Sequence, residues 1–415
     1  MRRMIGYLSA LDGLADSFGI GRSGFTVEAL TRSALDGARR PDFCDRSFEE
    51  PLRLLLECYV READLNVFGR FAAKWDVARC LTNLLRLDEE EEHNSAILDE
   101  PITRPIFITG SPRSGTTFLH TLLAQDPSIA LPRCWQTIFP YPAKGKKRDT
   151  RRQTVARQLS FFQRLAPEMA ALHPLTADSP QECTEITSQV FQSLRFETTH
   201  HIPSYQKWID TTGHLAAYRF HKRFLQHLQH QQGARRWILK CPDHVHALNA
   251  IETVYPDCGF VFVHRDPLRV IASAAKLTEV IRRPFARSVD KHEIGRQAVG
   301  RTLEGAQTMV TRSRTTPRER LFHIHYAELV RDPMAIVESL YANFGVEMTV
   351  EGRQRIRAFL DRSHQTATNH YSFEEFGLDP HALSMQFASY MNHFDVLRES
   401  PAWKTQDPAR AAIAA

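Results

Sequence analysis

The chain lacks the features that mark secreted and membrane-spanning proteins. Its seven cysteines are scattered and include no C-x-x-C pair, which argues against a disulfide framework or a zinc site. It has no run of about 18 apolar residues, so no transmembrane helix is expected. The residues that follow Met1 are too polar for the apolar region of a secretory signal. We therefore expect a cytoplasmic protein.

The chain also has little excess charge. A formal net charge of +5 is too small to require a nucleic-acid partner, and it suits a protein that binds anions in local pockets. Hydrophobic residues make up 42% of the 415 residues, enough for a sizeable core. The length allows two domains or one large α/β domain with helical additions. No internal repeat or low-complexity segment is evident.

Residues 1–100 are predicted to form a helical N-terminal extension. Residues 48–59 and 65–87 carry apolar side chains at three- and four-residue spacing, which is typical of amphipathic helices. The acidic run 88–92 is typical of a solvated segment and is expected to end this region.

Residues 101–415 show an alternation of strands and helices. Apolar strands are expected at 106–108, 237–239, 260–263 and 321–326, and helices are expected at 116–125, 245–254, 268–277 and 333–345. This pattern predicts an α/β fold: a P-loop-like three-layer sandwich whose central parallel sheet binds ligands beyond the carboxyl ends of its strands. The segment 126–235 is too long for a simple crossover, so we expect a mostly helical insertion that builds the wall of a pocket.

One loop nearly matches a phosphate-binding pattern but lacks its lysine. Residues 110–117 read Gly-Ser-Pro-Arg-Ser-Gly-Thr-Thr, and free N–H groups at a helix start point into such a loop. Nucleotide-hydrolysing enzymes have a lysine where this chain has Thr116. The cation here is Arg113, whose paired donors match a tetrahedral oxyanion. We predict a phosphate or phosphosulfate cradle, the alternative being a turn that binds nothing.

Two further strand ends carry basic residues. Arg265 lies at one strand tip, and Ser273 lies about one and a half turns along the helix that follows, so both can hold one phosphate. Lys240 follows another strand and suits the stabilisation of charge on a bridging oxygen. Each pattern alone also fits an exposed ion pair or an exposed lysine. Two anion sites in one sheet, however, indicate a ligand that is phosphorylated at both ends.

Together these motifs resemble those of the sulfotransferases that use 3′-phosphoadenosine 5′-phosphosulfate (PAPS), most of all the bacterial branch related to tyrosylprotein sulfotransferases. The resemblance covers residues 104–348, with a weaker match at 370–377. The segments that carry it are P-R-S-G-T-T, W-I-L-K-C-P-D-H, V-F-V-H-R-D-P-x₅-S and Y-A-E-L-V-R-D-P. The ordered set is specific, whereas any single motif is not.

The resemblance implies roles for individual residues. Arg265 and Ser273 should hold the 3′-phosphate, Lys240 should stabilise the transferring sulfuryl group, and Tyr326 should lie near the nucleotide. Because Arg113 and Lys240 supply the positive charge for catalysis, no metal is expected. The loop residues that should hold the 5′-phosphosulfate are Arg113, Ser114, Gly115, Thr116 and Thr117.

The general base is harder to assign. Relatives commonly have glutamate at the position of Gln136, and a glutamine cannot accept a proton. Glu182 and Glu185 lie three residues apart and would share one face of a helix. We favour Glu182 as the base, although an acidic side chain there also fits helix-start stabilisation. Three histidines are alternative bases: His173, His201 and His244. Of these, we keep His173 together with Glu182 as a catalytic candidate.

The acceptor is predicted to be a small or lipid-like molecule with a hydroxyl group, because some relatives sulfate lipid-like or quinone alcohols. The basic segment 144–152 fits either contact with an anionic membrane surface or a solvated loop. The sequence leaves the oligomeric state open, and a homodimer is one alternative. Aromatic residues of the insertion either line an acceptor site or form helical core: Trp135, Phe139, Tyr141, Phe161, Phe162, Phe191, Phe196, Tyr205 and Trp208.

Two other functions remain as alternatives. A P-loop kinase or NTPase would need a lysine at Thr116 and a metal-binding aspartate at a strand end, where Asp266 is the nearby candidate. A degenerate member of the family would bind the nucleotide but would have lost catalysis. Gln136 is the residue that best supports this alternative.

Overall fold

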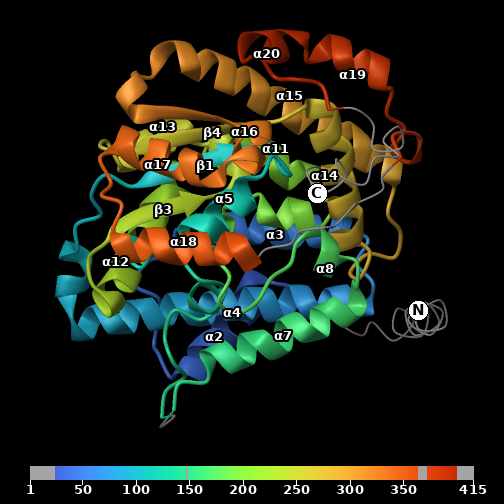
Figure 1. The fold of residues 1–415 in the computed structure, drawn as a ribbon. Helices are drawn as coiled ribbons and strands as arrows, with labels where there is room; N and C mark the ends of the chain where they lie inside the picture. The colour runs from blue at the N-terminus through green and yellow to red at the C-terminus, as the bar shows by residue number, and fades with distance from the viewer. Residues whose placement is uncertain (1–23, 146–147, 363–371, 400–415) are drawn as a thin grey trace.

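The architecture is an α/β sandwich built on a parallel sheet (Figure 1). The computed structural model describes residues 24–145, 148–362 and 372–399. These residues form a five-stranded sheet in the order β2-β3-β1-β4-β5. The predicted strands are confirmed, whereas the short β2 inside the insertion was not predicted. The strands are β1 (Ile106–Gly110), β2 (Ile129–Ala130), β3 (Arg236–Lys240), β4 (Gly259–His264) and β5 (Leu321–His325).

Strand pairing gathers the predicted motifs at one edge of the sheet. Strand β1 pairs in parallel with β3 and with β4, and Ile106 lies opposite both Ile238 and Gly259. Strand β5 extends the sheet beyond β4 in the same direction. The carboxyl ends of β3, β1, β4 and β5 therefore meet at the edge where ligands bind in such sheets.

Helices cover both faces, which confirms the three-layer sandwich. One hydrophobic cluster joins Ile106 and Ile108 of β1 to the helices on one face. Another joins Phe107 to the helices on the other face. The first group comprises α5 (Thr116–Leu123), α16 (Tyr326–Arg331), α17 (Pro333–Phe344) and α18 (Val350–Arg362). The second comprises α12 (Leu215–Gln232), α13 (Leu248–Val254) and α15 (Lys291–Thr315).

The N-terminal helices share their core with the insertion. They are α2 (Val27–Ala38), α3 (Glu49–Arg61) and α4 (Val67–His93). One hydrophobic cluster runs from these helices into α12 and the segment around Phe196. The division of the chain at residue 100 stays a prediction.

The acidic run 88–92 is not a solvated end to this region, so that prediction was wrong. Helix α4 continues through the run to His93, and Asp88 is only 3% exposed. Asp88 Oδ1 accepts a hydrogen bond from Arg223 Nη2 at 2.6 Å, and Glu91 accepts one from Arg223 Nε at 2.5 Å. Arg223 of α12 therefore offsets part of the negative charge of the run, which stays helical and packs against α12.

The insertion is mostly helical, as predicted. Phe191, Phe196 and Tyr205 are fully buried, which supports the core alternative for these three aromatic residues. Figure 1 shows α7 lying along α4 at one side of the molecule. The insertion helices before α12 are α6 (Cys134–Ile138), α7 (Arg151–Leu165), α8 (Met169–Leu172), α9 (Thr184–Thr187), α10 (Arg195–Thr199) and α11 (Pro203–Thr212).

The C-terminal part adds α19 (Pro380–Gln386) and α20 (Ala388–His393), and α14 (Pro267–Arg282) follows β4. In the weak sequence match at 370–377, residues 370 and 371 lie outside the described residues. None of the helices in the described ranges is long and apolar enough to cross a membrane.

Candidate active site

The loop after β1 has the geometry of an anion cradle. Arg113 and Gly115 adopt left-handed φ angles of 69° and 96°, and α5 begins directly after Gly115. A Cβ atom on Gly115 would lie 2.7 Å from Cδ2 of Tyr326, and one on Gly110 would lie 2.5 Å from the carbonyl oxygen of Val263. Both positions therefore require glycine, and the tight turn sets the N-terminus of α5 at the ligand-binding edge.

Ser114 gives a direct test of whether this loop fits a ligand. Its side chain is fully buried, and no described residue forms a hydrogen bond with its Oγ. An unsatisfied buried hydroxyl costs about 1–3 kcal/mol, and an oxygen of a bound anion would satisfy it. The residues of the loop therefore fit the 5′-phosphosulfate group that the sequence predicts.

The two predicted anion sites lie next to each other. Arg113 Nε donates a hydrogen bond to Ser273 Oγ at 3.0 Å. Arg265 Nη1 donates to the carbonyl oxygen of Arg113 at 2.8 Å. A further hydrogen bond joins Arg113 Nη1 to the carbonyl oxygen of Leu172 in α8. The structure thus brings together the residues predicted for the two ends of the ligand.

Arg265 lies between an aromatic ring and a carboxylate. Its guanidinium carbon is 3.8 Å from the centroid of the Tyr326 ring. Its Nε and Nη2 donate to the two carboxylate oxygens of Glu399 at 2.7 and 2.9 Å. Glu399 was not found from the sequence, because it lies 134 residues from Arg265 and belongs to no recognisable motif.

Asp266 has a structural role. Its Oδ1 accepts a hydrogen bond from Leu268 N at 3.0 Å and caps α14, and its Oδ2 accepts one from Glu399 N at 2.8 Å. No group of three or more His, Cys, Asp or Glu side chains in the described part of the chain is placed to hold a metal ion.

The buried Lys240 and the partly exposed Glu182 form an ion pair at the end of β3. Lys240 Nζ donates to Glu182 Oε1 at 2.5 Å and to Thr117 Oγ1 at 3.1 Å, and the lysine side chain is 2% exposed. Burial raises the pKa of the Glu182 carboxyl, but the positive charge of Lys240 outweighs this effect and holds that pKa below its usual value. Glu182 is therefore ionised at neutral pH.

His173 belongs to the same neighbourhood. Burial lowers its pKa to about 4, against the opposing effect of Glu182 and with the help of Lys240 and Arg113. A neutral imidazole at physiological pH has one nitrogen that can accept a proton. The structure thus places the two predicted catalytic candidates near the same lysine.

Comparison with known proteins agrees with these motifs. A family model described as the sulfotransferase family matches residues 105–350, which is more than half of the chain. The chain belongs to the sulfotransferase family. The enzyme is 24% identical over 284 residues to the omega-hydroxy-beta-dihydromenaquinone-9 sulfotransferase Stf3 of Mycobacterium tuberculosis, covering 64% of this chain and 69% of that protein.

Solved structures give the same family. Sulfotransferase STF9 from Mycobacterium avium superposes with a TM-score of 0.80 at 28% identity, covering 91% of this chain and 98% of the other. Sulfotransferase STF1 from Mycobacterium tuberculosis superposes with a TM-score of 0.77 at 27% identity, covering 88% and 98%. These likenesses extend well beyond the matched family segment into the N-terminal helices.

Gln136 and Glu185 have structural roles in this sulfotransferase. Gln136 Oε1 accepts a hydrogen bond from Arg133 N at 3.0 Å and so caps the start of α6. Glu185 accepts a hydrogen bond from the buried Arg79 Nη2 at 2.6 Å. Of the two glutamates that share this segment, only Glu182 contacts Lys240 among the described residues.

The remaining histidine candidates have other surroundings. His244 is fully buried, and its Nδ1 shares a hydrogen bond of 2.5 Å with the hydroxyl of Tyr218. His201 is half-buried, burial lowers its pKa, and its charged neighbours include Arg282 and Glu293. Neither histidine forms a hydrogen bond with Lys240 or Glu182 among the described residues, although burial, with a contribution from the charge of Lys240, lowers the pKa of His244.

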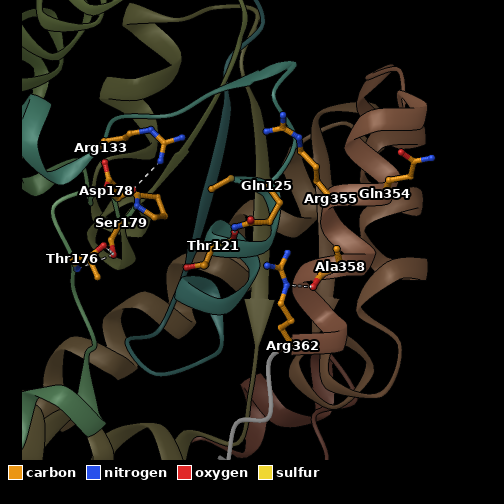
Figure 2. A pocket seen from close by; sticks show the side chains of 12 residues that line it. Thr121, Gln125, Arg133, Thr176, Asp178, Ser179, Gln354, Arg355, Ala358 and Arg362 are labelled. Atoms are coloured by element: carbon orange, nitrogen blue, oxygen red, sulfur yellow. Dashed lines mark hydrogen bonds between the residues drawn. The ribbon is translucent and has the colours of Figure 1, made fainter.

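A polar groove is lined by side chains of three segments of this sulfotransferase (Figure 2). It has a volume of about 740 Å³ and lies between α5, the segment 176–180 and α18. Pro180 at its wall is two residues before Glu182. Arginines enter the groove from both sides, and Arg133 donates to the carbonyl oxygen of Asp178 at 2.9 Å. A smaller cavity of about 140 Å³ lies against residues 110–112 and is lined by apolar side chains such as Leu194 and Met309 together with polar and charged ones such as Asp243 and Arg301.

Proposed function

We propose that this sulfotransferase transfers a sulfuryl group from PAPS to the hydroxyl of a small or lipid-like acceptor. The observation that supports this most is the convergence of Arg113, Lys240, Arg265 and Glu182 at one edge of the sheet. A lipid-like acceptor is supported by the similarity to a sulfotransferase that is named for a menaquinone.

The binding residues divide between the two ends of the donor. We assign the 5′ end to the amides of the 110–117 loop, the guanidinium of Arg113 and the buried hydroxyl of Ser114. We assign the 3′-phosphate to Arg265 and Ser273, with the ring of Tyr326 beside them. Bound PAPS supplies an activated sulfuryl group, and the protein supplies orientation and charge.

The reaction needs a base and a cation, and the Lys240–Glu182 pair provides both. Glu182 accepts the proton that the acceptor hydroxyl loses as its oxygen bonds to sulfur. Lys240 neutralises the charge that develops on the bridging oxygen as the old sulfur–oxygen bond breaks. His173 is the alternative proton acceptor. In both cases the proton acceptor lies near the buried Lys240, where electrostatic interactions are stronger than in bulk water.

Transfer of labelled sulfate tests the proposal. The purified protein is incubated with PAPS labelled in the sulfuryl group and with a lipid and metabolite extract of the source cells. We expect label in an acceptor product that partitions into organic solvent, with release of adenosine 3′,5′-bisphosphate. Bisphosphate binding without transfer to any acceptor in a broad screen would favour a degenerate relative instead.

A further inference from the structure

The outer face of α4 and α7 carries exposed aromatic rings flanked by arginines. We propose that this face, defined by Phe71, Trp75, Arg157, Phe161 and Arg164, docks on the surface of a membrane that contains anionic lipids. This property goes beyond the proposed reaction and does not depend on it, because it concerns binding to a lipid surface rather than group transfer.

The aromatic rings are unusually exposed for their size. Phe71, Trp75 and Phe161 are 53%, 50% and 52% exposed. Phe71 and Trp75 lie four residues apart on α4 and therefore share one helix face. Phe161 of α7 joins them, because its ring lies 6.1 Å from that of Phe68, which is one turn before Phe71. Large aromatic side chains grouped on a surface mark an interaction site.

The charge on α7 has one sign. The helix contains four arginines and no acidic residue. Arg157, Phe161 and Arg164 are spaced by four and three residues, so they lie on one face. Arg157 and Arg164 are exposed, and no carboxylate in the described ranges pairs with either. Basic side chains around aromatic rings are the pattern of a helix that lies at a membrane interface.

The basic segment 144–152 is a weaker candidate for this contact. Lys144 is paired with Glu89, Arg151 with Asp149 at 2.8 Å, and Arg152 with Asp178. These pairs neutralise part of the positive charge that the sequence places there. Arg157 and Arg164, which are exposed further along α7, lie on the same helix face as Phe161.

The face also connects to the reacting groups. Phe162, next to Phe161, stacks on Phe285 with a centroid distance of 5.9 Å and packs against a cluster that includes Met169 and Leu172. The carbonyl oxygen of Leu172 accepts a hydrogen bond from Arg113, and His173 follows directly. The face is therefore joined through packed side chains to the segment that holds Leu172 and His173.

An oppositely charged lipid surface fits this face better than a second protein does. The three rings are each about half exposed and lie on two adjacent helices. Rings in this arrangement can enter the headgroup region while the arginines stay at the level of the phosphates. A protein partner would instead need a complementary concave surface, and the arginines would need matching carboxylates.

Vesicle binding by the full chain tests the proposal. Sedimentation is measured with phosphatidylcholine vesicles that contain or lack phosphatidylglycerol. We expect binding to the anionic vesicles that falls several-fold when salt is raised to about 0.5 M, because screening shortens the range of the arginine charges. The double variant R157Q/R164Q should weaken this binding about tenfold, and W75S/F161S should do the same.

Matched controls separate this face from nonspecific adsorption. Arg357→Gln on α18 and Met385→Ser on α19 change exposed residues elsewhere and should leave vesicle binding unchanged. Adenosine 3′,5′-bisphosphate affinity, measured for every variant, reports whether the fold is intact. The proposal is overturned if anionic vesicles do not bind, or if the controls lose as much binding as the two double variants. It is equally overturned if those double variants abolish a dimer seen by sedimentation while vesicles remain unbound.

Discussion

At the scale of single residues, the proposed mechanism rests on the contact between Glu182 and Lys240. The lysine is almost completely buried, and its partners in the described structure are the Glu182 carboxylate and the Thr117 hydroxyl. A cation in such a place needs a counter-charge, because an unpaired buried charge is costly. The proton taken up by Glu182 during the reaction would weaken this pair, and Lys240 would then be free to turn toward the departing oxygen.

Replacement of Glu182 by glutamine tests its role as the base. We expect Glu182→Gln to lower turnover by about 10²–10⁴ while affinity for adenosine 3′,5′-bisphosphate stays nearly intact. His173→Asn is the matched comparison, because both side chains lie beside the same lysine. Near-normal turnover in Glu182→Gln together with a large loss in His173→Asn would assign the base to the histidine.

Glu399 adds a second prediction at this scale. Its carboxylate occupies Nε and Nη2 of Arg265, so a phosphate that binds this arginine must replace those hydrogen bonds. We expect Glu399→Gln to bind adenosine 3′,5′-bisphosphate about tenfold more tightly, a difference that calorimetry measures readily. Glu351→Gln, which changes an exposed pair with Arg355, is the control. Weaker binding by Glu399→Gln would show that the carboxylate supports the site instead.

At the scale of elements, buried ion pairs connect α4 to the insertion. Asp76 of α4 lies 2.6 Å from Arg195 of α10 and 2.8 Å from Arg79, which in turn pairs with Glu185. Burial raises the pKa of Asp76, but the charges of the two arginines more than offset it and hold that pKa well below its usual value. The ionised carboxylate of Asp76 therefore helps to hold α4 and α10 together.

This network predicts how stability depends on pH. Because the folded-state pKa of Asp76 is depressed, its contribution is present above its unfolded pKa of about 4 and is lost as the pH falls below that value. We expect Asp76→Asn to cost about 3–5 kcal/mol at pH 7 and to flatten the acid limb of the stability curve. Urea unfolding between pH 3 and pH 7 measures both effects. An unchanged acid limb would exclude Asp76 as its source.

The sequence predicts the elements of the sheet better than the contacts of the insertion. Strand ends such as Gly110, Lys240 and Arg265 can be found because each lies in a local pattern of strand, turn and helix. The acidic run 88–92 was misinterpreted because its partner, Arg223, is 135 residues from Asp88. Glu399 was missed for the same physical reason: side chains far apart in sequence meet only after the chain has folded.

At the scale of the whole molecule, the fold separates two tasks. The edge of the sheet gathers the residues that we assign to the donor, while the N-terminal helices and the insertion form one shared core beside it. The helices of that second part carry the exposed face of α4 and α7. The proposed donor site thus lies at the edge of the sheet. The proposed contact with lipid lies on α4 of the N-terminal helices and on α7 of the insertion.

The central claim is that Arg113 and Arg265 hold the two ends of one bisphosphorylated nucleotide. Calorimetry of the intact protein with adenosine 3′,5′-bisphosphate, adenosine 5′-monophosphate and Mg-ATP tests it most directly. We predict that the bisphosphate binds most tightly, and that Arg265→Ala removes its advantage over the monophosphate while leaving the monophosphate affinity nearly unchanged. A preference for Mg-ATP, or a bisphosphate preference that survives Arg265→Ala, would contradict the account.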